Sequence, residues 1–211
     1  MVLAAAMAIC ANAAPKKKKP AKGSAGKFEY YLLTLSWAPD FCAVPSNPQD
    51  PAECGQGRKV GFVVHGLWPQ GDQGKGPENC GGPQVPQNII DAMLKYMPTA
   101  SLIQHEWSTH GTCSGLSLED YFAAVRKARD SVTIPDDLQT PSQSRKLSPG
   151  AIENKFGAAN PAFPKTAFRT SCSHGTLQEV RICFTKDLAP QGCTASAGEC
   201  TMKTMTVLPV Q

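Results

Sequence analysis

Three of the four histidines of this 211-residue chain lie in two dense blocks of polar and aromatic residues. The first block is residues 65–69 (His-Gly-Leu-Trp-Pro), and the second is residues 105–113 (His-Glu-Trp-Ser-Thr-His-Gly-Thr-Cys). An imidazole titrates near pH ~6.5, so two separated histidines can remove and donate a proton within one reaction. The two blocks are therefore the candidates for an acid–base site.

Cleavage of RNA by its own 2′-hydroxyl needs this set of groups, because one group removes the 2′ proton and another protonates the leaving 5′ oxygen. On a helix Glu106 and His110 are i and i+4, so we expect the carboxylate to support the imidazole. His105 and Thr109 are also i and i+4, and they lie beside the first pair on the surface of the predicted helix. The charge that develops on phosphorus then needs a donor or cation nearby. Trp68 offers a stacking face for an unpaired base.

Two other hydrolytic chemistries are open to the same residues. A zinc peptidase of the H-E-x-x-H type needs its histidines four residues apart, whereas His105 and His110 are five apart. A thiol enzyme would pair Cys113 with His110, but an exported chain with an even number of cysteines favours a bridged Cys113. Both remain weaker alternatives, and we expect no bound metal or cofactor.

The chain begins with a segment that we interpret as an export signal. Residues 1–14 are a short apolar run that ends in an Ala-Asn-Ala pattern, too short for a membrane span of about 20 residues. Residues 15–27 contain six of the 21 basic residues and no acidic residue, which predicts a solvated Lys/Pro linker. The folded domain, at 28–211, then has 15 basic and 17 acidic residues, so its net charge does not indicate nucleic-acid binding. No later stretch is apolar enough to cross a membrane.

Nine cysteines become eight when the predicted signal, which contains Cys10, is removed. An even number of cysteines in an exported chain predicts a disulfide framework and a secreted or periplasmic location. Eight cysteines allow about 105 pairings, so the count alone cannot assign the bridges.

The order of the predicted elements indicates an α+β fold, with strands at both ends and helices between them. Apolar, β-prone runs predict strands at 30–35 and 59–64, with His65 at the end of the second, and later strands at 177–184 and 203–208. Apolar periodicity predicts helices capped by Asn88, Ser117 and Ser148, and another through residues 102–111 whose Trp107 packs in the core. Residues 70–87 and 132–147 are expected to be loops, and His174 is expected to be a structural or exposed loop residue.

The two blocks together resemble the signatures of the ribonuclease T2 family, H-G-L-W-P and H-E-W-x-K-H-G-T-C. Residues 35–42 and 177–183 also resemble this family, so the resemblance spans residues 28–208. It implies a twisted antiparallel sheet flanked by helices and stabilised by disulfides. It further implies a metal-independent endoribonuclease that cuts single-stranded RNA through a 2′,3′-cyclic phosphate to a 3′-phosphate. We expect the protein to be a monomer.

The resemblance also implies roles for particular residues. His110 would be the general base of the first step and His65 the general acid, while Glu106 and His105 would bind the phosphate and stabilise the transition state. Trp68 would stack on a base. The disulfides implied by analogy are Cys42–Cys54, Cys80–Cys113, Cys172–Cys200 and Cys183–Cys193.

One departure from the family pattern concerns Thr109, which stands where the family usually has a lysine before the second catalytic histidine. Loss of one transition-state stabiliser commonly costs about 10²–10³-fold in rate. We therefore expect reduced activity, unless Thr109 itself or a basic residue elsewhere substitutes. The alternative is a weakly active or inactive RNA-binding member. Gln70 stands where some relatives have an acidic residue that reads a purine, so base preference stays open.

Overall fold

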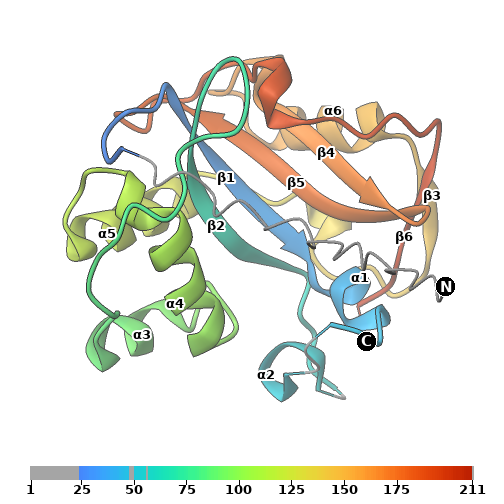
Figure 1. The fold of residues 1–211 in the computed structure, drawn as a ribbon. Coiled ribbons are helices and arrows are strands. Elements are labelled where there is room, and N and C mark those ends of the chain that lie inside the picture. Colours follow the sequence, from blue (N-terminus) through green and yellow to red (C-terminus); the bar gives the residue numbers. More distant parts are fainter. Residues whose placement is uncertain (1–23, 48–49, 56, 211) are drawn as a thin grey trace, which may run out of the picture.

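The computed structural model describes residues 24–47, 50–55 and 57–210, and it contains a six-stranded sheet with helices packed against it (Figure 1). The strands are β1 (Tyr30–Trp37), β2 (Phe62–Gln70), β3 (Arg145–Leu147), β4 (Phe168–Ser173), β5 (Thr176–Phe184) and β6 (Met205–Val207). The helices are α1 (Ala38–Ala43), α2 (Pro51–Cys54), α3 (Gln87–Met93), α4 (Ala100–Thr109), α5 (Leu118–Asp130) and α6 (Pro149–Ala159).

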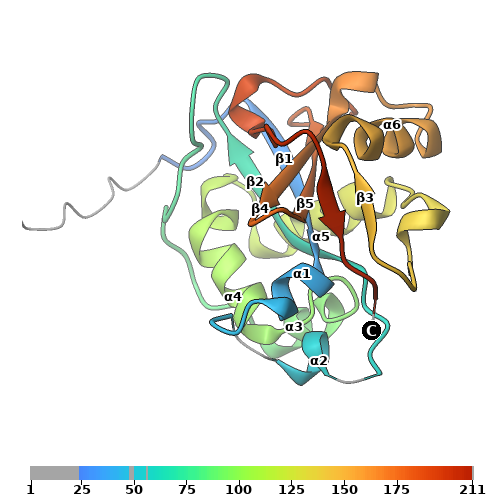
Figure 2. The same cartoon turned by 90° about the vertical axis from the view of Figure 1, so that its right-hand side faces the viewer.

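The strand order is β2-β1-β5-β6-β3, with β4 paired to β5. All pairs are antiparallel, as expected, except the contact between β5 and β6, which is parallel. Figure 2 shows β3 and β6 side by side near α6. The chain thus has the predicted α+β class, with a mixed sheet.

Strand β1 lies between β2 and β5, and its side chains alternate between two faces of the sheet, as they do in any strand. The odd-numbered residues from Tyr31 to Trp37 belong to the main hydrophobic core, whereas Tyr30 and Leu32 belong to a smaller cluster on the other face. The main core is completed by apolar side chains of α4, α5 and α6. Burial of this apolar surface drives these helices onto one face of the sheet.

Side-chain caps were predicted at the start of three helices, and two of the three are present. The side chain of Ser117 accepts the backbone N–H of Asp120 at the start of α5, and Ser148 caps α6 in the same way, with Pro149 in the first turn. The prediction for Asn88 was wrong, because α3 begins at Gln87 after Pro86. A proline at that position fixes a backbone angle compatible with helix entry without any side-chain cap.

Other local predictions need correction. Residues 132–147 are not only a loop, since they contain a short 3₁₀ turn at Asp136–Leu138 and strand β3. The predicted strand at 59–64 begins later and runs on through Gln70, so His65 lies inside β2 and not at its end. Helices α1 and α2 and strand β4 were not predicted.

Four disulfides connect the eight cysteines of the folded domain, in the pairing that the family resemblance implied: Cys42–Cys54, Cys80–Cys113, Cys172–Cys200 and Cys183–Cys193. The predicted signal (1–14) and the linker as far as residue 23 lie outside the described residues. The last linker residues form a turn, in which the N–H of Gly26 donates to the carbonyl of Cys113. Within the described part of the chain, no helix has the length and apolar character needed to cross a membrane.

Candidate active site

A β-bulge in β2 turns His65 toward the candidate site. Gly66 pairs with Thr34 of β1, and Val64 pairs with the next residue, Leu35, so His65 is an extra residue without a partner in the ladder. Regular alternation would place residue 65 on the core side with Leu67, and the extra residue moves its side chain to the face that carries Gly66. The imidazole of His65 therefore belongs to the same face as Trp68.

Glu106 is buried on α4 at 1% exposure and its carboxylate contacts His65 and Trp68. The indole Nε1–H of Trp68 donates to Glu106 Oε2 at 2.7 Å, and Glu106 Oε1 lies 3.5 Å from His65 Nε2. Burial, opposed by the positive charge of His65 and the hydrogen bond from Trp68, raises the pKa of Glu106 to about 7. The sequence led us to expect this carboxylate beside His110; it is directed at His65 instead.

Gly66 makes this contact possible. A Cβ atom at position 66 would collide with Glu106 Oε2 and with Trp68 Nε1. The glycine of the first block therefore lets the carboxylate and the indole meet directly over the backbone of β2.

His110 follows the last residue of α4, where its backbone N–H bonds to the carbonyl of Glu106. Its ring centroid is 5.1 Å from that of Trp68, and the His65 ring lies at the same distance from Trp68. Burial and the nearby charges of His65 and His105 lower the pKa of His110 to about 4. At neutral pH the imidazole of His110 is therefore uncharged and can accept a proton.

His65 has the opposite electrostatic setting. Burial alone would lower its pKa, but the hydrogen bond to Glu179 and the charges of Glu106 and Glu179 outweigh that effect, so the pKa lies above its ordinary value of 6.5. The structure thus brings together one imidazole that favours the charged form and one that favours the neutral form. Paired groups with pKa values shifted apart are the usual arrangement for a division of acid and base roles.

Glu179 and Arg181 on β5 are site residues that the sequence analysis missed. Glu179 Oε1 lies 2.9 Å from His65 Nδ1, and Arg181 donates to Glu179 Oε2 from Nε at 3.0 Å and from a terminal nitrogen at 2.8 Å. Although burial would raise the pKa of Glu179, these partners hold it below its ordinary value. The sequence signal was present as two charged residues two apart in a strand, which must share one face.

The remaining predicted site residues lie at the edge of this cluster. His105 is well exposed, and its Nε2 is 4.0 Å from Glu106 Oε1. Thr109 is half-buried, and its carbonyl accepts the N–H of Asn79 at 2.7 Å. Gln70 accepts a hydrogen bond from the backbone of Gly76 and so helps to fold the loop after β2.

Trp107 was expected to pack in the core, and His174 was expected to be structural or exposed. Trp107 is buried in the main core, where its Nε1–H donates to the carbonyl of Pro83. His174 is exposed in the turn between β4 and β5, where its Nδ1 lies 2.8 Å from the hydroxyl of Ser173.

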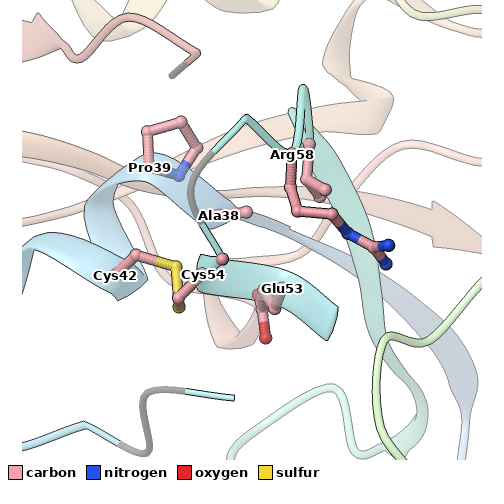
Figure 3. Close-up of a pocket in the computed structure, with 8 residues that line it drawn as sticks. Ala38, Pro39, Cys42, Glu53, Cys54 and Arg58 are labelled. Atoms are coloured by element: carbon pink, nitrogen blue, oxygen red, sulfur yellow. A yellow bond between two sulfur atoms is a disulfide. The ribbon is translucent and has the colours of Figure 1, made fainter. Parts of the chain in front are cut away.

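Several cavities lie near this part of the sheet. One, of about 290 Å³, is bordered by His65, Glu179 and Asp40. A largely apolar cavity of about 340 Å³ is bordered by both His65 and His105, with Phe41, Val63 and Leu102 among its walls. A smaller pocket of about 150 Å³ lies between α1 and α2 beside the Cys42–Cys54 disulfide (Figure 3). None of the site histidines lines the smaller pocket, so we do not place the site there.

Comparisons with known proteins identify the family and the fold of the chain. The sequence profile of the ribonuclease T2 family matches residues 28–193. The chain is 34% identical over 171 residues to a ribonuclease of Aeromonas hydrophila, which covers 79% of this chain and 76% of that protein. It is 29% identical over 180 residues to ribonuclease DdI of Dictyostelium discoideum, covering 77% and 76% respectively. The solved structure of an RNase-related protein from Calystegia sepium matches with a TM-score of 0.69 and 25% identity over 86% of this chain and 97% of that one.

Proposed function

The chain belongs to the ribonuclease T2 family, and on this premise we propose that it is a secreted or periplasmic endoribonuclease that cuts single-stranded RNA without a metal ion. In the proposed first step His110 removes the proton of a 2′-hydroxyl, the 2′ oxygen bonds to phosphorus, and the bond from phosphorus to the 5′ oxygen breaks. His65 donates a proton to that leaving oxygen. Water then opens the 2′,3′-cyclic phosphate to a 3′-phosphate, with the two histidines exchanging roles.

The observation that carries this proposal is the difference in pKa between His65 and His110, whose rings each lie 5.1 Å from that of Trp68. Environment lowers the pKa of His110 to about 4 and raises that of His65 above 6.5. Between those values the resting enzyme contains a neutral base and a charged acid, which is the state that the first step requires.

The other site residues fit supporting roles in the same proposal. Glu106, whose pKa is near 7, and the exposed His105 would bind the phosphate and stabilise its charge. The cavity beside His65 and His105 lies within the size range of small-molecule sites and would take one nucleoside. Trp68 is only partly buried, so we retain it as a stacking surface for a base.

The four disulfides support the proposed compartment, because such bonds form and persist in oxidising surroundings. We propose that the enzyme acts there as a monomer, in which one chain supplies every group of the site.

The proposed function is tested by incubating purified protein with a fluorescently labelled single-stranded RNA in excess chelator. We expect cleavage at the same rate with and without chelator. Strong inhibition by chelator that zinc reverses would favour a metallohydrolase, and RNA binding without cleavage would favour the non-catalytic alternative.

The pH dependence of kcat/KM follows from the two shifted pKa values. We expect the rate to rise as pH increases through about 4, where His110 loses its proton, and to fall above 6.5, where His65 loses the proton that it must donate. The profile should therefore be a bell with an acidic optimum. Initial rates on a dinucleotide substrate across this range give the profile directly. If the rate instead rises only above pH 6.5, His110 is not the neutral base that the mechanism assigns.

Replacement of Thr109 tests whether the absent lysine limits the rate. We expect Thr109→Lys to raise the turnover number, by up to about 10²-fold, because a cation beside His110 would stabilise the phosphorane charge. Thr109→Gln, which has similar length and no charge, is the matched control and should leave the turnover number within about threefold of wild type. An unchanged or lower rate in the lysine variant would show that another group already supplies this stabilisation.

A further inference from the structure

A partly buried pair of charged residues, Glu179 and Arg181, contacts the Nδ1 side of the His65 ring, whereas Glu106 lies nearest to Nε2. The Nδ1 atom of His65 is 2.9 Å from Glu179 Oε1, and Arg181 holds the other carboxylate oxygen of Glu179 with two hydrogen bonds. The third nitrogen of Arg181 donates to the carbonyl of Ala197 at 2.9 Å. Glu179 thus orients His65, and Arg181 orients Glu179.

The strand register explains how these residues meet across the sheet. Glu179 stands opposite Ser36 of β1, and Arg181 stands opposite Thr34, so both point to the face that also carries His65. Strand β1 separates β2 from β5 (Figure 1). The small side chains of Thr34 and Ser36 leave the space in which the imidazole and the carboxylate make contact above β1.

We propose that Glu179 is a positioning residue for His65 and that Arg181 keeps Glu179 ionised for that task. The inference rests on the proposed function, in which His65 is the acid that acts on RNA. With Nδ1–H donated to Glu179, the Nε2 atom of His65 faces Glu106 and the site, so one tautomer and one ring orientation are selected. The carboxylate also stabilises the imidazolium that must be present before the 5′ oxygen leaves.

The side chain of Arg181 is held mainly by Glu179, as the positioning role requires. All three of its nitrogens already donate, two of them to Glu179 and one to Ala197. Its guanidinium carbon lies 6.0 Å from the centre of the Trp68 ring, so it is near the site but committed to the buried carboxylate. Removing its charge would take two hydrogen bonds from the carboxylate of Glu179, which is buried at 5% exposure, and leave it paired with His65.

Other charged groups also face His65 and bear on its protonation. Glu106 and His105 lie on α4, and His110 follows the same helix. The carboxylate of Glu53 on α2 interacts electrostatically with His65. On α1, Asp40 borders the same cavity as His65 and Glu179. Among all of these, Glu179 makes the shortest polar contact with the imidazole, so its loss should have the largest effect.

The first test is an NMR titration of the histidine ring signals in wild type, Glu179→Gln and Asp137→Asn. Asp137→Asn is the matched control, because it neutralises a carboxylate paired with Arg145 and Lys155 that is not among the groups shifting the pKa of His65. We expect Glu179→Gln to lower the pKa of His65 by about 1–3, as for loss of an adjacent opposite charge, and the control to leave it unchanged. A pKa of His65 that is the same in Glu179→Gln and wild type would overturn the proposal.

The second test measures kinetics on RNA with the same proteins. We expect Glu179→Gln to lower kcat by about 10–100-fold, as removal of such a supporting partner commonly does, with KM within about twofold of wild type and the alkaline limb moved to lower pH. Glu179→Asp, which keeps the charge, should restore part of kcat. Equal losses in the Asp and Gln variants with an unmoved pH profile would indicate a purely structural ion pair.

The two tests separate the failure of this inference from failure of the proposed function. A wild-type protein that does not cut RNA would refute the proposed function, while the NMR titration would still decide whether Glu179 controls His65. If Glu179→Gln does not fold, Arg181→Gln probes the same group of residues, and we expect it to raise the pKa of Glu179. The charge of Arg181 itself lowers the pKa of His65, so the pKa of His65 should not fall in this variant. An unchanged pKa of Glu179 would contradict the role given to Arg181.

Discussion

The His110→Ala variant is expected to lose about 10²–10⁴-fold in kcat on single-stranded RNA, because the proposed general base is removed. The fold should be retained, since His110 ends α4 through its backbone N–H and not through its ring. His65→Ala should lose a similar factor through loss of the acid. Steady-state rates on a labelled oligoribonucleotide, with the melting temperature of each variant, test both effects.

The matched control for the histidine variants is His174→Ala, which removes an exposed imidazole from the turn between β4 and β5. We expect its kcat to equal that of wild type. If His110→Ala retains activity within about tenfold of wild type, less than loss of a general base commonly costs, then His110 is not the base. Loss of activity accompanied by a large fall in melting temperature would indicate a structural effect instead.

Replacement of one ribose by 2′-deoxyribose in the substrate is expected to abolish cleavage at that linkage. The proposed nucleophile is the 2′ oxygen of the substrate itself, and no group of the enzyme can take its place in forming the cyclic phosphate. We would cleave a series of oligoribonucleotides, each with a single deoxy position, and separate the products by electrophoresis. In each case the product of cleavage at the deoxy position should be missing.

The control for the deoxy series is the set of neighbouring linkages in the same oligonucleotide, which must still be cleaved because their 2′-hydroxyls are intact. Cleavage that persists at a deoxy position would show that water or an enzyme group attacks phosphorus. Such a result would return the metallohydrolase alternative to consideration, since a metal-bound water needs no 2′-hydroxyl.

Local features of the fold were predictable where one short segment determines them. Ser117 and Ser148 cap helices because each side chain reaches the backbone of a residue three positions later, a contact that sequence spacing specifies. The cap at Asn88 failed because Pro86 already sets the entry into α3. Strand β3 was missed because its three residues become a strand only by pairing with β6, about 60 residues later.

The candidate site was predictable in its residue types but not in its contacts. The bulge that turns His65 depends on the register between β1 and β2, which no single segment encodes. The partner of His65 is Glu179, 114 residues away, so only the completed sheet brings them together. Helical spacing suggested that Glu106 supports His110, but the close approach allowed by Gly66 directs the carboxylate to Trp68 and His65.

The most direct test of the central claim is to identify the product ends early in the reaction of wild type with single-stranded RNA in excess chelator. The two-histidine mechanism predicts 2′,3′-cyclic phosphate ends that appear first and convert later to 3′-phosphate. Their formation should be absent in His110→Ala. Linear 3′- or 5′-phosphate ends from the earliest time point, with no cyclic intermediate, would contradict the mechanism.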